Sequence, residues 1–270
     1  MTNEQKPVVV LTVAGFDPSG GAGVLADIKT IAAFGCYGVA AVSGITFQNT
    51  LGVSGVLSES AKTIRQQIAP LFDDFEIAAV KTGMLPTAEV VQEVASLIRQ
   101  RAIPVVVVDP VIRSTSGFEL VERAAIDSLV THLFPLASLI TPNRLEAELI
   151  SRVPIQNRLQ AERAGETILR KGARAVLITG GDTESSLDLL VDKDGSIAFN
   201  AEHVQSQNTH GTGCSFASAL ACLMAQGRAP KEAIPIAKDY VQRAILSAPG
   251  LGHGQGPLNH FPPGFKPDPK

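Results

Sequence analysis

The stretch Asn208-Thr-His-Gly-Thr-Gly-Cys214 runs directly into the apolar segment Ser215-Phe-Ala-Ser-Ala-Leu-Ala-Cys-Leu-Met224. A polar turn that contains glycine and leads into an apolar run predicts a loop that opens a helix. The first amides of a helix have no internal acceptor and carry partial positive charge, so they form a natural site for phosphate oxygens. Gly211 and Gly213 lack a Cβ atom and would let the backbone approach an anion closely.

Cys214 is expected in the first turn of this helix, where the positive end lowers the pKa of a thiol. We therefore interpret the stretch as a phosphoryl-transfer site that includes its own acid/base group. A plain N-cap turn with Cys214 as a small buried residue is the alternative, and for a motif this short it is the commoner one. The rest of the chain has to decide between the two interpretations.

The bulk composition favours a single large α/β domain over residues 1–270. The chain has 270 residues, of which 45% are hydrophobic, and this is enough for a sizeable core. Its 23 basic and 26 acidic residues give a net charge of −3 without a basic cluster, so neither nucleic acid nor an anionic membrane is expected as a partner. The polar, short N-terminus and the lack of a long apolar run predict a cytoplasmic protein.

The three cysteines, Cys36, Cys214 and Cys222, form no CxxC pair and show no metal-ligand spacing with histidine. Neither a disulfide framework nor a zinc site is therefore expected.

Strand and helix patterns alternate along the chain, which predicts a three-layer α/β/α sandwich around a mostly parallel sheet. Strands are expected over residues 8–14, 37–47, 77–82, 104–109, 138–141, 175–179, 187–191 and 197–199. Helices are expected over residues 24–34, 60–72, 88–101, 122–132, 144–151, 161–171, 213–226 and 231–247. Residues 48–52 are expected as a polar loop, and residues 248–270, which are rich in Gly and Pro, as an irregular tail.

Polar residues or glycines follow the predicted strands. These are Gly15 and Asp17, Gln48 and Asn49, Gly83, Asp109, Asn143, Gly180 and Gly181. In parallel sheets, ligands bind beyond the carboxyl ends of the strands. Turns also favour such residues, but a buried strand that ends in Asp109 is harder to dismiss, because desolvating a carboxylate is costly without partners. One edge of the sheet is therefore predicted to hold the site.

The chain resembles the ribokinase-like superfamily, and within it the hydroxymethylpyrimidine and phosphomethylpyrimidine kinases of thiamine biosynthesis. The resemblance extends over almost the whole chain and is carried by motifs in the family's order. These are Ala14-Gly-Phe-Asp-Pro-Ser-Gly-Gly-Ala-Gly23, Phe47-Gln-Asn-Thr50, Lys81-Thr-Gly-Met84, Asp109-Pro-Val111, Thr141-Pro-Asn143 with Glu146, Asn208 to Cys214, and Gly252-His-Gly-Gln-Gly-Pro257.

This resemblance implies a kinase that uses ATP and Mg²⁺. It would phosphorylate 4-amino-5-hydroxymethyl-2-methylpyrimidine and then convert the monophosphate to the diphosphate. The residues that match the family's pyrimidine site are Gly15, Asp27, Gln48, Met84 and Val111. The side-chain amide of Gln48 can donate and accept at an aminopyrimidine edge. The resemblance also implies a homodimer.

For phosphoryl transfer, the resemblance implies an anion hole of backbone amides at Gly211, Thr212, Gly213 and Cys214, with Cys214 as the base for the substrate hydroxyl. A thiolate is a weak base for an alcohol, so positioning could contribute more than proton removal. The matching nucleotide residues are Asn143, Glu146, Lys238 and Thr209, and the metal is assigned to Glu146 and Asp109. Taken alone, Asn143 and Glu146 are equally compatible with helix capping, and Lys238 with a solvated helix lysine.

Two positions depart from the family pattern. Phe16 stands where a small or hydroxyl residue is usual, and Thr179-Gly-Gly-Asp182 stands where many members have Lys-Gly-Gly-His. A pyridoxal or pyridoxine kinase is the nearest rival interpretation, because it would share the fold, the donor and a hydroxymethyl acceptor. A pyrimidine- or nucleotide-binding protein without catalytic activity is the rival of a different class.

Overall fold

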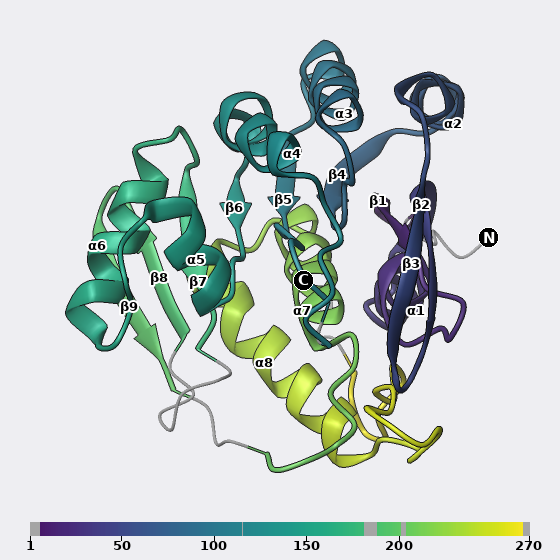
Figure 1. Ribbon diagram of the computed structural model, residues 1–270, viewed down its shortest axis with the longest axis vertical. Coiled ribbons are helices and arrows are strands. Elements are labelled where there is room, and N and C mark those ends of the chain that lie inside the picture. The colour runs from purple at the N-terminus through teal and green to yellow at the C-terminus, as the bar shows by residue number, and fades with distance from the viewer. Residues whose placement is uncertain (1–5, 115, 181–187, 201–203, 267–270) are drawn as a thin grey trace.

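The computed structural model describes residues 6–114, 116–180, 188–200 and 204–266. Within them the chain forms one sheet of nine strands in the order β3-β2-β1-β4-β5-β6-β7-β8-β9 (Figure 1). The six central strands, β2, β1, β4, β5, β6 and β7, pair with one another in parallel. Strand β3 at one edge pairs antiparallel with β2, and at the other edge β8 pairs antiparallel with β7 and β9. The prediction of a mostly parallel sheet is confirmed.

The strands are β1 (Val9–Phe16), β2 (Tyr37–Asn49), β3 (Gly52–Ser58), β4 (Ile77–Thr82), β5 (Val105–Val108), β6 (Leu139–Ile140), β7 (Ala175–Ile178), β8 (Asp188–Asp192) and β9 (Gly195–Phe199). The helices are α1 (Gly23–Ala33), α2 (Ala61–Asp74), α3 (Ala88–Arg101), α4 (Arg123–Ser128), the π-helical turn η1 (Leu129–Leu133), the 3₁₀ turn η2 (Phe134–Leu136), α5 (Arg144–Ser151), α6 (Arg158–Leu169), α7 (Thr212–Ala225) and α8 (Pro230–Leu246).

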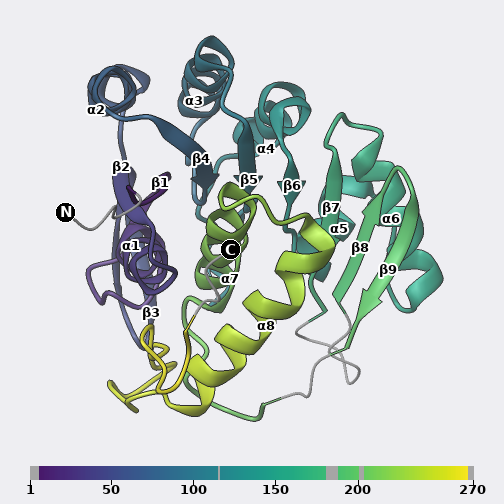
Figure 2. The ribbon, with the colours of Figure 1, turned by 180° about the vertical axis from the view of Figure 1, so that it is seen from behind.

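Helices cover both faces of the sheet, so the three-layer arrangement is confirmed. Helices α1, α7 and α8 lie on one face, which is turned toward the viewer in Figure 2, and α2 to α6 lie on the other. Each face has its own apolar core: Val80, Ile98 and Ile140 belong to one, and Phe34 and Leu220 to the other. Because both faces are covered, the parallel strands are continuous apolar runs rather than alternating ones.

The hairpin of β2 and β3 differs from the sequence prediction. Residues 48–52 were expected as a loop after one strand, but β2 extends to Asn49, and β3 returns antiparallel after a short turn. Strand β3 is an edge strand with mostly half-buried or exposed side chains, so it carries no apolar run that would reveal it. Helix α2 also continues through Pro70 to Asp74, held by the buried stripe of Ile64, Ile68 and Phe72.

Four elements meet at a carboxylate in the core. Asp27 on α1 is fully buried and forms an ion pair with Lys81 on β4, whose Nζ lies 2.9 Å from both carboxylate oxygens. The hydroxyl groups of Thr12 on β1 and Ser218 on α7 donate to the same carboxylate, at 2.6 and 2.8 Å. Burial alone would lower the pKa of Lys81, but the negative charge of Asp27 raises it above its usual value.

No helix within the described residues has the length and apolar character needed to cross a membrane.

Replacing Lys81 with Met tests the contribution of this pair to stability. The substitution leaves Asp27 as a buried carboxylate without a counter-charge, so the free energy of unfolding should fall by about 3–5 kcal/mol. Urea denaturation measures the loss. Arg101→Met is the matched control, because Arg101 forms an exposed pair with Asp73, and it should cost less than about 1 kcal/mol. Equal losses in the two variants would show that the buried pair has no special role.

Candidate active site

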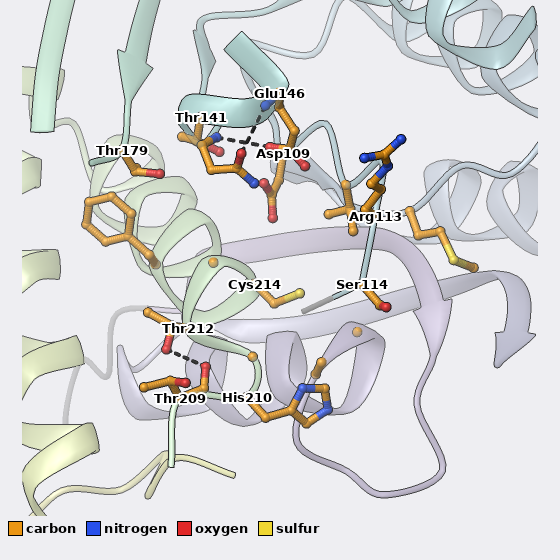
Figure 3. Close-up of a pocket in the computed structure, with 18 of the residues that line it drawn as sticks. Asp109, Arg113, Ser114, Thr141, Glu146, Thr179, Thr209, His210, Thr212 and Cys214 are labelled. Carbon is orange, nitrogen blue, oxygen red and sulfur yellow. Dashed lines mark hydrogen bonds between the residues drawn. The ribbon is translucent and has the colours of Figure 1, made fainter. Parts of the chain in front are cut away.

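A cavity of about 1130 Å³ lies along the carboxyl edge of the sheet (Figure 3). Such a volume exceeds that of a typical drug-sized pocket, so it can hold a nucleotide and a second small molecule. Its walls come from the ends of β1, β2 and β5, the loop that follows β5, the start of α5, the turn before α7, and one face of α8. The sequence-predicted residues that line it are Gly15, Gln48, Met84, Asp109, Val111, Asn143, Glu146, Thr209, Gly211, Thr212, Gly213, Cys214 and Lys238.

The N-termini of α1 and α7 meet at this cavity. Gly211, the N-cap of α7, has φ +84°, and a Cβ atom there would lie 1.9 Å from the carbonyl oxygen of Gly21, just before α1. The amide of Gly23, the first residue of α1, donates to the sulfur of Cys214 on α7. Only glycine satisfies both the left-handed conformation and the contact at position 211. Two positive helix ends therefore point to one place.

The turn before α7 supplies unused backbone donors. The amide of Thr212 donates to the carbonyl of Thr209 at 3.2 Å, and the Thr212 hydroxyl donates to the same carbonyl at 2.7 Å. The first internal helix bond is that of Ser215 to Gly211. Within the described residues, the amides of Gly213 and Cys214 donate to no other group. These two amides, rather than that of Thr212, are free to bind an anion.

The thiol of Cys214 behaves differently from the sequence prediction. A position at a helix N-terminus suggested a lowered pKa, but burial raises the pKa of Cys214 to about 12, although Lys81 opposes the shift. The nearby carboxylates of Asp27 and Asp109 raise it further. Desolvation of the thiolate therefore outweighs the helix end. Cys214 is nevertheless only half-buried by exposed area and lines the cavity, so its thiol is within reach of a ligand.

Asp109 and Glu146 face the same end of the cavity as Thr141 (Figure 3). Burial raises the pKa of Asp109 to about 6, with Lys81 opposing the shift, and burial together with the charge of Asp109 raises the pKa of Glu146 to about 8. Oδ2 of Asp109 is buried without a hydrogen-bond partner. The carboxylates of Asp109 and Glu146, with the unpartnered Oδ2 of Asp109, offer oxygen ligands for a hard divalent cation, and such a cation would stabilise their negative charge.

Asn143 and Glu146 also cap helix α5. Oδ1 of Asn143 accepts from the amide of Glu146, and Oε2 of Glu146 accepts from the amide of Asn143, both at 3.0 Å. Oε1 of Glu146 accepts from the amide of Ile112 at 3.2 Å. The capping role considered from the sequence is therefore present, and both residues line the cavity as well. A capping box holds them rigidly at its wall.

Lys238 on α8 reaches the cavity but is not a free cation. Its ammonium group pairs with Asp188 at the start of β8, and the amide of Gly180 donates to the same carboxylate at 3.0 Å. Thr179 lines the cavity nearby, whereas Gly181 and Asp182 of the sequence motif lie outside the described residues.

Four of the five predicted pyrimidine residues line the same cavity. Met84 is buried and packs so closely on Gly15 that a Cβ atom on this glycine would lie 2.6 Å from the terminal methyl group of Met84. Gln48 at the end of β2 and Val111 after β5 are the other two. Phe16, expected to alter the shape of the pocket, is not among the lining residues.

Asp27 does not belong to the cavity. The family resemblance places Asp27 against the pyrimidine, but its carboxylate is fully buried and is bound by Lys81, Thr12 and Ser218. No oxygen of Asp27 is available to a ligand, and the residue is absent from the lining. The geometry gives Asp27 a structural role beneath α7 instead.

Several lining residues were assigned no role from the sequence. Asp17 was named only among the residues that follow the strands, and His210, Arg113 and Ser114 were not singled out. His210 stands inside the glycine turn before α7, and Nε2 of His210 lies 2.8 Å from Oδ2 of Asp17 in the loop before α1. The sequence signal for Asp17 is its place directly after a buried strand. For His210, the only feature of the sequence that points to the site is its position between Thr209 and Gly211 in the turn. Arg113 pairs with Glu119 on the exposed rim.

Comparison with known proteins decides the family. The family model described as phosphomethylpyrimidine kinase matches residues 17–259, which include both helix N-termini and, except for Gly15, the predicted residues that line the cavity. The chain belongs to the phosphomethylpyrimidine kinase family. It is therefore a kinase, and the sequence-based resemblance is confirmed.

Curated relatives of this kinase carry related names. The chain is 40% identical over 255 residues to the hydroxymethylpyrimidine/phosphomethylpyrimidine kinase of Streptomyces coelicolor, covering 94% of each chain. It is 43% identical over 254 residues to the thiamine biosynthesis bifunctional protein ThiED of Geobacter sulfurreducens. That match covers 93% of the kinase but only 52% of the longer bifunctional protein.

Solved structures show the same fold. The phosphomethylpyrimidine kinase of Clostridium difficile 630 is 38% identical, with a TM-score of 0.79 over 88% of this kinase and 99% of that chain. The pyridoxal kinase of Staphylococcus aureus in complex with AMP-PCP and pyridoxal is 30% identical, with a TM-score of 0.86 over 95% of each chain.

Replacing Gly211 or Gly213 with alanine should affect stability and nucleotide binding differently in this kinase. At Gly211 a Cβ atom would collide with the Gly21 carbonyl, whereas at Gly213 the nearest atom within reach is Oδ2 of Asp109 at 3.9 Å. Gly211→Ala should therefore lower the melting temperature by several degrees, an effect of roughly 2 kcal/mol or more. Gly213→Ala should melt close to the wild type but bind ATP more weakly. Thermal melts and nucleotide titration measure both, and unchanged melting of Gly211→Ala would contradict the packing described.

Proposed function

We propose that this kinase transfers the terminal phosphoryl group of ATP to the hydroxymethyl group of 4-amino-5-hydroxymethyl-2-methylpyrimidine, and then phosphorylates the monophosphate to the diphosphate, in thiamine biosynthesis. The observation that carries the proposal is the cavity itself. The unused amides of Gly213 and Cys214 line the same cavity as Gln48 and Met84 and as Asp109 and Glu146. The names of the relatives support the same reaction.

In this proposal the amides of Gly213 and Cys214 bind the phosphoryl group as negative charge spreads over its oxygens. The helix ends of α1 and α7 add partial positive charge at the same place. The buried ammonium of Lys81 lies below, close enough to affect the pKa of both Cys214 and Asp109. Phosphoryl transfer needs positioning and charge stabilisation more than covalent chemistry, and these groups provide both.

The protonated thiol of Cys214 argues for a positioning role rather than a base. A thiol whose pKa is raised to about 12 holds its proton at neutral pH and is a poor base for an alcohol, although Cys214 is half-buried and lines the cavity. We propose that Cys214 packs against the acceptor hydroxyl and orients it toward the phosphorus atom. As the acceptor oxygen forms its bond to phosphorus, the bond from phosphorus to the bridging oxygen of ATP breaks and ADP leaves, and the hydroxyl proton moves to an oxygen of the transferred phosphoryl group.

The residues present fit a bound Mg²⁺ ion. We propose that Asp109, through its unpartnered Oδ2, and Glu146 at the capping box of α5 hold the ion directly or through water. When bound, Mg²⁺ neutralises charge on the phosphate oxygens. Asn143, Thr209 and Lys238 are proposed nucleotide residues on the same side of the cavity.

We also propose that the kinase works in the cytoplasm as a homodimer. Phe47 on β2 and Leu57 on the edge strand β3 expose about half of their surface, at 52% and 55%. Exposed apolar side chains at an edge of the sheet support association with a second copy.

Parallel assays of ADP release test the proposed reaction. The pyrimidine alcohol and its monophosphate should both support ADP formation with ATP, and the pyrimidine alcohol should have a higher kcat/KM than pyridoxal. The structural likeness to a pyridoxal kinase makes pyridoxal the necessary comparison. A preference for pyridoxal would replace the substrate assignment, and ligand binding without any ADP would indicate a protein that is not catalytic.

Substitution of Cys214 tests its role in transfer. Cys214→Ala should lower kcat by roughly tenfold to hundredfold through misplacement of the hydroxyl, with little change in KM for the pyrimidine. Cys214→Ser, which keeps a polar atom there, should retain more activity than Cys214→Ala. Because the thiol of Cys214 keeps its proton far above pH 7, the pH profile of kcat between pH 6 and 9 should be the same in the wild type and Cys214→Ser. A wild-type ionisation in that range that Cys214→Ser abolishes would restore the thiolate as base.

A further inference from the structure

A segment after α8, residues 252–260, runs along the outside of the cavity without lining it. We call this segment the strap. It lies beside the end of the β2–β3 hairpin in both views of the ribbon (Figures 1 and 2). It contains the motif Gly252-His-Gly-Gln-Gly-Pro257, which carries part of the family resemblance but lies outside the proposed substrate sites. Its hydrogen bonds connect parts of the chain that are far apart in sequence.

The first half of the strap packs on Thr50, in the turn between β2 and β3. The hydroxyl of Thr50 accepts from the amides of His253 and Gly254, at 3.2 and 3.3 Å. The carbonyl of Thr50 accepts from the amide of Gln255 at 2.8 Å. A Cβ atom at Gly254 would lie 2.1 Å from that carbonyl oxygen, so only glycine allows the two backbones to approach so closely. The strap therefore holds the tip of the hairpin.

The second half of the strap holds the turn before α7 through Gly256. The amide of Gly256 donates to the carbonyl of Gln207, and its carbonyl accepts from the amide of His210, both at 3.1 Å. A Cβ atom at Gly256 would lie 2.1 Å from the side-chain oxygen of Asn208. His210 directly precedes Gly211, the N-cap of α7. The strap therefore fixes the backbone that leads into the proposed phosphate-binding turn.

The end of the strap is anchored on α8. Leu258 and His260 are buried. The amide of Asn259 donates to the carbonyl of Ala244 at 3.0 Å, and the hydroxyl of Tyr240 donates to the carbonyl of His260 at 2.9 Å. Other side chains of α8 line the cavity. The strap is thus attached to three walls of the site, namely the end of β2, the turn before α7, and α8.

The end of β2 needs such an attachment because it extends beyond the main sheet. The backbone pairing of β2 with β1 ends at Ile45, opposite Phe16, whereas the pairing of β2 with β3 continues to Asn49. Gln48 therefore lies on a two-stranded ribbon, which is only marginally stable by itself. Reacting groups must be held about 3–3.5 Å apart for efficient transfer, so a ribbon that moved by about 1 Å would misplace an acceptor bound there.

We propose that Thr50 is a positioning residue of this kinase, which sets the distance between the end of β2 and the phosphate-binding turn through the strap. This role rests on the proposed function, in which Gln48 binds the acceptor and the amides of Gly213 and Cys214 bind the phosphoryl group. Thr50 follows Gln48 closely in the chain and does not line the cavity. It acts on the reaction through its bonds to the strap and not through contact with a substrate.

Thr50→Val tests this role, because valine keeps the shape and the carbonyl of the residue but cannot accept from the two strap amides. The kcat with the pyrimidine alcohol should fall by at least about fivefold, because the acceptor is misplaced. The Kd of ATP and that of the alcohol, each titrated alone by calorimetry, should change by less than about twofold, because the residues that contact them remain. An unchanged kcat would overturn the proposal.

Two further variants separate positioning from a general effect on the hairpin. Thr50→Ser keeps the hydroxyl acceptor, so its kcat should return to within about twofold of the wild type. Ser54→Ala is the matched control, because the exposed hydroxyl of Ser54 on β3 donates to the carbonyl of Phe47 at 2.9 Å rather than bonding to the strap. Its kcat should equal that of the wild type. A loss in Ser54→Ala or Thr50→Ser as large as that in Thr50→Val would contradict the positioning role.

Hydrogen exchange of the free protein tests the strap independently of the substrate. In the wild type the amides of His210 and Gly256 should be protected, and in Thr50→Val they should exchange at least about tenfold faster, whereas amides in the middle of α7 should keep their rates. Rapid exchange of both amides in the wild type, or rates unchanged by Thr50→Val, would overturn the proposal. Failure of the proposed function looks different, because the wild type would then release no ADP with the pyrimidine alcohol.

Discussion

The buried ion pair between Asp27 and Lys81 is the constraint on which the site depends. It joins α1 to β4, and the hydroxyls of Thr12 and Ser218 extend it to β1 and α7. A buried carboxylate is stable only with such complete pairing. Because α1 and α7 share this anchor, their N-terminal ends are held at one point of the sheet edge. The close backbone contact between Gly21 and Gly211 requires that alignment.

The site combines charges of opposite sign in separate places. Two helix ends and the ammonium of Lys81 make the centre favourable for phosphate, whereas Asp109 and Glu146 make the neighbouring end favourable for a divalent cation. The same burial keeps the thiol of Cys214 protonated. A phosphoryl group would therefore be held by the helix dipoles on one side and by a divalent cation, bound to the two carboxylates, on the other. The neutral thiol of Cys214 would face the acceptor.

Much of the fold could be predicted from the sequence, because buried parallel strands are uninterrupted apolar runs and their polar ends mark the site. Strand β3 was missed because an edge strand shows no such run. Asp27 was assigned to the ligand because the family pattern contains it, although Val24, Asp27 and Ile31 occupy one helix face and all three are buried. That spacing was a readable sign of a core position.

The electrostatic features could not be predicted in the same way. A helix N-terminus and burial shift the pKa of a thiol in opposite directions, and the sequence around Cys214 does not show how deeply it is buried. The contact of His210 with Asp17 joins residues 193 positions apart, and no local pattern reports it. From the sequence, helix capping and ligand binding were alternatives for Asn143 and Glu146. The structure shows that both residues form the capping box of α5 and also line the cavity.

A crystal structure of this kinase with a non-hydrolysable ATP analogue and the pyrimidine alcohol would test the central claim most directly. The account predicts the terminal phosphate within hydrogen-bonding distance of the amides of Gly213 and Cys214, and the pyrimidine ring between Gln48 and Met84. A nucleotide bound elsewhere, for example in the smaller cavity between β9 and α8 around Phe199 and Gln242, would contradict it.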